Sequence, residues 1–375
     1  MKSSYRIFRI FGISIELHIT FILLLLILFT VGWLGESFIA GLQLVLLFIL
    51  LFTIVVAHEI SHSIVALMWK IKVPRITLLP IGGMANIEIP EKPHIELIMS
   101  IAGPLLNIVL SVICFLIILF AVSDPISFLS EWKWDVFYMS KAIFNPGGIL
   151  KFFLYINIVL AVFNLLPIFP MDGGRILRAL LALFIEYTRA TSIAVNIGQY
   201  LSLLMIILGI FSNPWIAIIG VLIYFAGGQE LKIVKLRHAL SGLTAGEVAI
   251  RNFDYVCESM SLKEFLENIA KPHIPYYPVV DSFGNIVGMF SIDRLKDIDH
   301  RKFEFMSVGE LTDRDFISID SNEKISERIL KLLESEFVFV VDEGRIIGYL
   351  TPNYLIDLAR FRGVTKRYIS GMSNG

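Results

Sequence analysis

Long apolar runs dominate the first 236 residues and are too long to be strands. A helix needs about 20 mostly apolar residues to cross a membrane, and six such segments can be read: 15–34, 42–69, 96–121, 149–186, 190–211 and 214–231. The second and fourth are longer than one crossing requires, so we expect tilt or an interruption there. The pattern predicts a polytopic α-helical membrane protein with six transmembrane helices over residues 1–236.

The cations between these segments predict an orientation, because Lys and Arg gather in cytoplasmic loops. One side of the membrane receives most of them, near residues 2–9, 70–92, 175–189 and 232–237, whereas the other receives only Lys133, Lys141 and Lys151. We therefore expect a multi-pass protein of the cell membrane with both termini cytoplasmic and residues 123–148 outside.

After residue 237 charges become frequent, and a pattern of strand, tight turn, strand and helix occurs twice with a period near sixty residues. Residues 277–281 and 286–291 return as 338–342 and 346–351. Such a unit cannot bury both of its faces alone, so the two copies should pack as an α/β pair. A further short β segment is expected between the second and third helices, within residues 75–89.

Composition supports a membrane class. The chain of 375 residues is 56% hydrophobic and only 17% charged, against roughly 45–50% and roughly 25% in soluble domains. A net charge of −1 argues against nucleic acid as a partner. The two cysteines are too few for a cysteine zinc cluster or a disulfide framework.

Three ionisable residues interrupt the second apolar segment, in the sequence His58-Glu59-Ile60-Ser61-His62. On a helix this spacing places both imidazoles on one face, where they can share a zinc ion, and a carboxylate beside them that can accept a proton from water. Lys70 marks the expected cytoplasmic end, so the histidines lie roughly 12–18 Å inside the membrane. Ionisable groups at such depth are functional by default.

Catalytic zinc takes three protein ligands, and the helix supplies two. Asp172 is the acid with the most distinctive apolar surroundings, because Pro167 and Pro170 interrupt its segment and Gly173 and Gly174 follow it. A bend there would aim Asp172 at the second helix. An interfacial acid beside nearby arginines is the alternative.

These residues resemble the site-2 protease family, zinc proteases that cleave transmembrane segments. The resemblance rests on four elements in the family's order: His58-Glu59-x-x-His62, residues 78–83, Gly103-Pro104-x-x-Asn107, and Asn164-x-x-Pro167 with Asp172-Gly173. It implies that Asp172 is the third ligand and that Asn164 positions substrate or stabilises an oxyanion. A helix–helix hydrogen bond is the alternative for Asn164, and Gly103 and Asn107 are interpreted as close-packing residues.

The repeat resembles a tandem CBS-domain pair, with domains over 241–300 and 304–362. Many such pairs bind adenosine nucleotides, which implies a nucleotide as a candidate partner. Members that bind ribose place an acid three residues after the Ser or Thr that ends the second strand. Here Arg294 and Tyr354 stand at those positions and Asp293 is one residue off. Homodimerisation or substrate gating is therefore as good an interpretation.

Together these features predict an intramembrane zinc metalloprotease with one Zn²⁺ per chain, acting on transmembrane protein substrates in regulated intramembrane proteolysis. Glu59 is the expected general base, and the CBS pair is expected to be regulatory. An open edge within 75–89 would hold an extended substrate strand; a plain hairpin over the cavity is the alternative. Two rival functions remain: a CBS-gated metal-ion transporter using the same His/Asp cluster as a transit site, and a zinc protease of soluble peptides.

Overall fold

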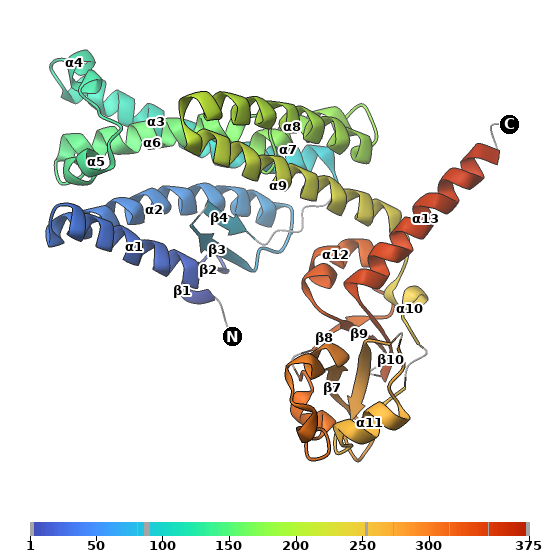
Figure 1. Ribbon diagram of the computed structural model, residues 1–375. Helices are drawn as coiled ribbons and strands as arrows, with labels where there is room; N and C mark the ends of the chain where they lie inside the picture. The colour runs from blue at the N-terminus through green and yellow to red at the C-terminus, as the bar shows by residue number, and fades with distance from the viewer. Residues whose placement is uncertain are drawn as a thin grey trace. The chain divides into compact units, whose positions relative to one another are not determined.

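A computed structural model describes residues 4–80, 82–85, 91–251, 254–272, 274–314, 316–343 and 345–372. The chain divides into two compact units, Met1–Lys232 and Ile233–Gly375 (Figure 1). Each unit has its own apolar cores.

Long apolar helices build the first unit. Among the residues that the structure describes, five helices are long and apolar enough to cross a membrane: α2 (Phe38–Met68), α3 (Pro93–Ala121), α6 (Pro146–Leu165), α8 (Tyr187–Ser212) and α9 (Pro214–Ala239). The expectation of a polytopic helical membrane protein is confirmed. Helix α1 (Ile19–Gly35) has 17 residues, fewer than these five, so the sixth span stays a prediction.

The outward faces of these helices are apolar. Leu34, Phe120 and Phe211 are 79%, 85% and 87% exposed, and each lies near one end of its helix. Large exposed apolar patches on a soluble protein would cause association, whereas lipid accommodates them. The exposure therefore agrees with a membrane-embedded unit.

The predicted fourth segment is interrupted, as expected from its prolines. Helix α6 ends at Leu165, and a separate helix α7 (Asp172–Ala182) follows. Pro167 and Pro170 lie in the connection, where each lacks the backbone N–H that would continue a helix. Asp172 is consequently the first residue of α7. The predicted external segment contains two short helices, α4 (Pro125–Ser130) and α5 (Val136–Ala142).

A four-stranded sheet packs beside α2. Its strands are β1 (Ser4–Ile10), β2 (Ile13–His18), β3 (Arg75–Leu79) and β4 (Gly82–Ala85), in the order β1-β2-β3-β4. Ile13, Ile15 and Ile76 are at most 1% exposed and pack with Phe52 of α2. The short β segment after the second helix is confirmed. The start of the first span at residue 15 is wrong, because residues 15–18 belong to β2 and the helix begins at Ile19.

The second unit contains two three-stranded sheets with equivalent pairing. The first has β5 (Val256–Cys257), β6 (Tyr276–Val280) and β7 (Ile286–Ser291); the second has β8 (Ile317–Asp320), β9 (Val338–Asp342) and β10 (Arg345–Leu350). In each, the first two strands are parallel and the last two antiparallel. The internal repeat is confirmed.

Helices flank both sheets: α10 (Ala245–Val248), α11 (Leu262–Asn268), α12 (Ile325–Glu334) and α13 (Pro352–Met372), with 3₁₀ turns η1 (Ile292–Asp297), η2 (His300–Lys302) and η3 (Val308–Leu311). The helix expected after β7 is the 3₁₀ turn η1, whereas its counterpart after β10 is the long α13. The backbone of Ile250 pairs with Tyr349 of β10, and that of Gly246 donates to Ser321. The segment that precedes the first repeat therefore packs on the second.

Candidate metal centre

Three potential ligands converge inside the first unit. His58 and His62 lie one turn apart on α2, and Asp172 begins α7. Asp172 Oδ2 lies 3.2 Å from the Nε2 atom of each histidine, and the two Nε2 atoms are 3.1 Å apart. His58 is 5% and His62 8% exposed. Bulk water therefore has little access to these atoms.

This arrangement fits a zinc ion. Ligand atoms about 2.05 Å from zinc at tetrahedral angles stand roughly 3.3 Å apart, close to the separations in the structure. Two imidazoles and a carboxylate form a donor set that zinc accepts in catalytic sites, where the fourth position is left for water or substrate. Among the described residues, His58, His62 and Asp172 form the group of donors that could share one metal ion.

Helix α3 orients both imidazoles through hydrogen bonds to their Nδ1 atoms. His62 Nδ1 lies 2.6 Å from the carbonyl oxygen of Met99, which can only accept, so Nδ1 carries a proton and donates it. His58 Nδ1 likewise lies 3.0 Å from Asn107 Oδ1. With Nδ1 protonated, the lone pair of each neutral ring lies on Nε2, the atom that faces Asp172.

The close approach of α3 depends on Gly103. A β-carbon there would lie 2.3 Å from His62 Nε2 and 2.5 Å from His58 Cε1, distances that no side chain tolerates. The interpretation of Gly103 and Asn107 as packing residues missed their contacts with the histidines. Their spacing of four residues places both on one helix face. The sequence shows this spacing, but it does not show which neighbouring helix the face contacts.

Glu59 lies under the edge strand β4. A β-carbon on Gly83 would come within 2.7 Å of Glu59 Cγ and 3.5 Å of a Val55 methyl group. Strand β4 pairs with β3 on one side. Within the described residues of this sheet, no strand pairs with its other side. The expected general base thus lies next to strand β4. The role of residues 75–89 in holding an extended substrate stays a prediction.

Asn164 lies at the end of α6, one residue before its last. Its Nδ2 donates to the carbonyl oxygen of Leu160, 3.0 Å away, in the preceding turn of the same helix. This contact neither places Asn164 on a substrate nor joins it to another helix. Its role in stabilising an oxyanion stays a prediction.

The repeat unit carries no acid at the two positions where nucleotide-binding members have one. Arg294 donates to Asp313, 3.0 Å away, and to the carbonyl oxygen of Leu311. The backbone nitrogen of Tyr354 donates to Thr351 Oγ1 at the start of α13. Asp293, one residue off, lies 2.6 Å from Lys296. Of these side chains, Arg294 and Asp293 thus form ion pairs within the repeat unit.

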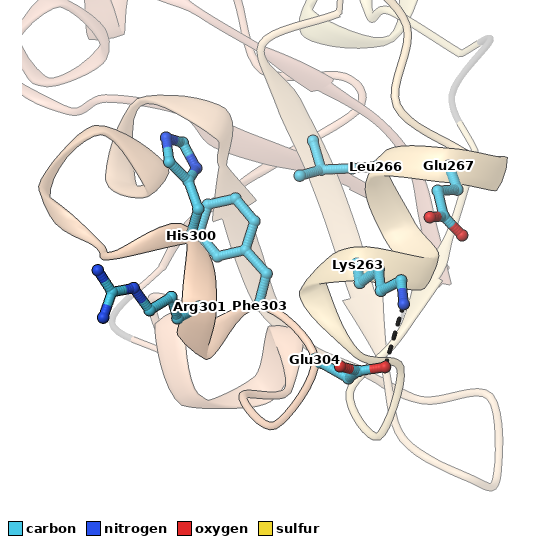
Figure 2. Close-up of a pocket in the computed structure, with 7 residues that line it drawn as sticks. All are labelled: Lys263, Leu266, Glu267, His300, Arg301, Phe303 and Glu304. Atoms are coloured by element: carbon cyan, nitrogen blue, oxygen red, sulfur yellow. Dashed lines mark hydrogen bonds and ion pairs between the residues drawn. The ribbon is translucent and has the colours of Figure 1, made fainter.

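A shallow surface cavity lies elsewhere on the first repeat, between α11 and η2 (Figure 2). Lys263 of α11 donates to Glu304 across its rim at 3.0 Å, and this bond raises the pKa of the lysine. His300 packs edge-on against Phe303 on the other wall.

Comparison with known proteins places these features in context. Residues 46–205 match the sequence model of peptidase family M50, and residues 245–300 and 308–360 match that of the CBS domain. A zinc metalloprotease of Methanocaldococcus jannaschii is 34% identical over 362 residues, covering 95% of this chain and 96% of the relative. A putative zinc metalloprotease of Synechocystis is 26% identical over 340 residues, covering 86% and 84%.

Among solved structures, the site-2 protease from Methanocaldococcus jannaschii is 37% identical. The match covers 61% of this chain and 95% of that chain, with a TM-score of 0.42.

Proposed function

Because this chain belongs to peptidase family M50, the zinc-dependent site-2 proteases, we propose that His58, His62 and Asp172 bind its zinc and that Glu59 is the general base. The observation that carries the proposal is the convergence of Asp172 on two histidines 114 and 110 residues earlier in the chain. When bound, zinc would act as a Lewis acid that activates water near neutral pH.

The protein's own residues handle the proton. Glu59 accepts a proton from the attacking water and delivers it to the leaving nitrogen of the cleaved amide, since one carboxylate can serve both steps. Its position between the ligands His58 and His62 and strand β4 supports this role. Asn164 is proposed to hold the carbonyl oxygen of the scissile bond, where charge develops.

We infer that the substrate is a transmembrane segment that unwinds and adds to strand β4. A helical amide is shielded by its own turn, whereas an extended segment can form backbone hydrogen bonds with an open edge. Strand β4 supports this because its Gly83 lies close to Glu59 and, within the described residues of the sheet, β4 pairs with β3 alone. Hydrolysis would then take place within or near the transmembrane segment.

A CBS-gated transporter is the less favoured function. The match to a peptidase family spans residues 46–205, which include every proposed ligand, and a transit site has no need of a base beside its ligands. Glu59→Gln separates the two functions in one preparation. The variant should keep about one zinc and lose hydrolysis, whereas a transporter would continue to move metal.

The kind of substrate can be tested with the same preparation. A single-span membrane protein should be cut by the wild-type protein in detergent, whereas a detached loop peptide of the same sequence should not. Equal cleavage of both would instead support a protease of soluble peptides. Loss of cleavage in His58→Ala, together with loss of zinc, is the control that ties activity to the site.

The remaining organisation is proposed from the sequence pattern. We propose a membrane domain over 1–236 and CBS domains over 241–300 and 304–362, with both termini cytoplasmic and the CBS pair regulatory. Binding of an adenosine nucleotide is expected to be weak, because Arg294 and Tyr354 occupy the usual acid positions. Homodimerisation through the CBS pair is the alternative use of this unit.

A further inference from the structure

A buried cluster of charges surrounds Arg178, six residues after Asp172 on α7. Arg178 is 3% exposed. Its Nε donates to Glu96 Oε1 at 2.9 Å, and its Nη1 donates to Glu230 Oε1 at 2.7 Å. Because Glu96 belongs to α3 and Glu230 to α9, one guanidinium joins three helices of the first unit.

Aromatic side chains complete the cluster. The guanidinium carbon of Arg178 lies 4.8 Å from the ring centre of Phe169 and 5.1 Å from that of Tyr187. The Tyr187 hydroxyl donates to Glu96 Oε2 at 2.9 Å. Phe169 is 1% exposed and stands three residues before Asp172. Arg178 therefore contacts the connection that leads into Asp172, and it belongs to the helix that Asp172 begins.

Buried ion pairs add little stability compared with apolar side chains of equal volume, but they are unfavourable when one partner is displaced. A planar guanidinium that donates in several directions also accepts few arrangements of its partners. Such a cluster fixes how helices are placed against one another. Since α7 has only 11 residues and begins at Asp172, fixing α7 fixes the carboxylate.

We propose that Arg178 is a positioning residue for Asp172 and that Glu96 and Glu230 hold its guanidinium in place. The inference rests on the proposed role of Asp172 as a zinc ligand. It assigns a positioning role to a cluster that takes no part in hydrolysis.

The experiment measures the zinc affinity of the full-length protein by competition with a chelator. Glu230→Ala should raise the zinc dissociation constant about 3–10-fold, less than the 10–100-fold typical of groups bonded directly to a ligand. It should also change the visible absorption spectrum of the cobalt-substituted protein, which reports ligand geometry. Glu230→Gln should keep most of the wild-type zinc affinity and cobalt spectrum, because its amide oxygen can still accept a hydrogen bond from Arg178.

A matched control is Glu131→Gln, which breaks an ion pair with the buried Lys151 (3.6 Å) on other helices of the same unit. It should leave the zinc affinity and the cobalt spectrum unchanged. If Glu230→Ala only lowers the melting temperature and leaves both readouts as in the wild type, the cluster is merely structural and the positioning role is refuted.

Failure of the proposed function would give a different result. If the wild type binds no zinc, or His58→Ala binds it equally well, the proposed function itself fails.

Discussion

The hydrogen bond between Asn107 and His58 can be tested by replacing Asn107 with leucine, which is nearly equal in size. In the folded protein Asn107 is fully buried and its Oδ1 lies 3.0 Å from His58 Nδ1. Zinc at Nε2 requires the proton on Nδ1, and without this acceptor that proton is left unsatisfied in an apolar environment, which costs about 1–3 kcal/mol. In the metal-free protein the ring can carry its proton on Nε2, next to Asp172, and avoid this cost. At about 1.4 kcal/mol per tenfold change, the zinc dissociation constant should rise about 5- to 150-fold.

The fold should be affected much less than the metal. Asn107 Nδ2 is buried and has no hydrogen-bond partner among the described residues. Leucine removes this unsatisfied donor, which offsets part of the loss, so the melting temperature of the metal-free protein should stay within a few degrees of the wild type. The loss should therefore appear in zinc binding and not in the stability of the helices.

The assay is chelator competition in detergent with wild type, Asn107→Leu and Asn107→Asp. The aspartate variant is the matched control, because its carboxylate accepts the same proton and should keep zinc affinity at or above the wild-type level. An unchanged dissociation constant in Asn107→Leu would refute the argument that α3 orients the ligand. Equal loss in both variants would mean that the site tolerates no change of shape there.

Four further outcomes are expected. Glu59→Gln should bind zinc like the wild type and reduce cleavage of a single-span substrate by roughly 10²–10⁴-fold; substantial remaining cleavage would contradict the mechanism. Gly83→Val should keep zinc but lose cleavage, because its β-carbon would lie 2.7 Å from Glu59 Cγ, whereas Gly82→Ala, with nothing within 4 Å of its added β-carbon, tests backbone strain alone. In a chain with both native cysteines replaced by serine, Ser130→Cys should react with an impermeant thiol reagent on intact cells and Ser282→Cys should not, both positions being exposed; the opposite result would invert the topology. Calorimetry of the full-length protein with ATP or AMP should detect at most weak binding, and tight stoichiometric binding would show that the ligand positions in the CBS pair were misassigned.

The sequence alone predicted features that depend on near neighbours. Apolar runs of about 20 residues are membrane helices whatever packs against them, because lipid satisfies no backbone hydrogen bond. The four-residue spacing of His58 and His62 places them together through helix geometry alone. The break before Asp172 follows from two prolines that cannot continue a helix. The repeat in the second unit was likewise visible, since each copy carries its own turn residues between two strands.

Tertiary structure decided which distant residues contact these local features. Asp172 had a rival interpretation as an interfacial acid, and only the fold brings it within 3.2 Å of both histidines. Strand β2 lies inside a sheet because it pairs in parallel with β3, a long-range pairing that no local pattern specifies. Asn107 and Gly103 contact the imidazoles because α3 packs on that face of α2. Helix faces are readable from periodicity, but the neighbour of each face depends on how distant segments pack.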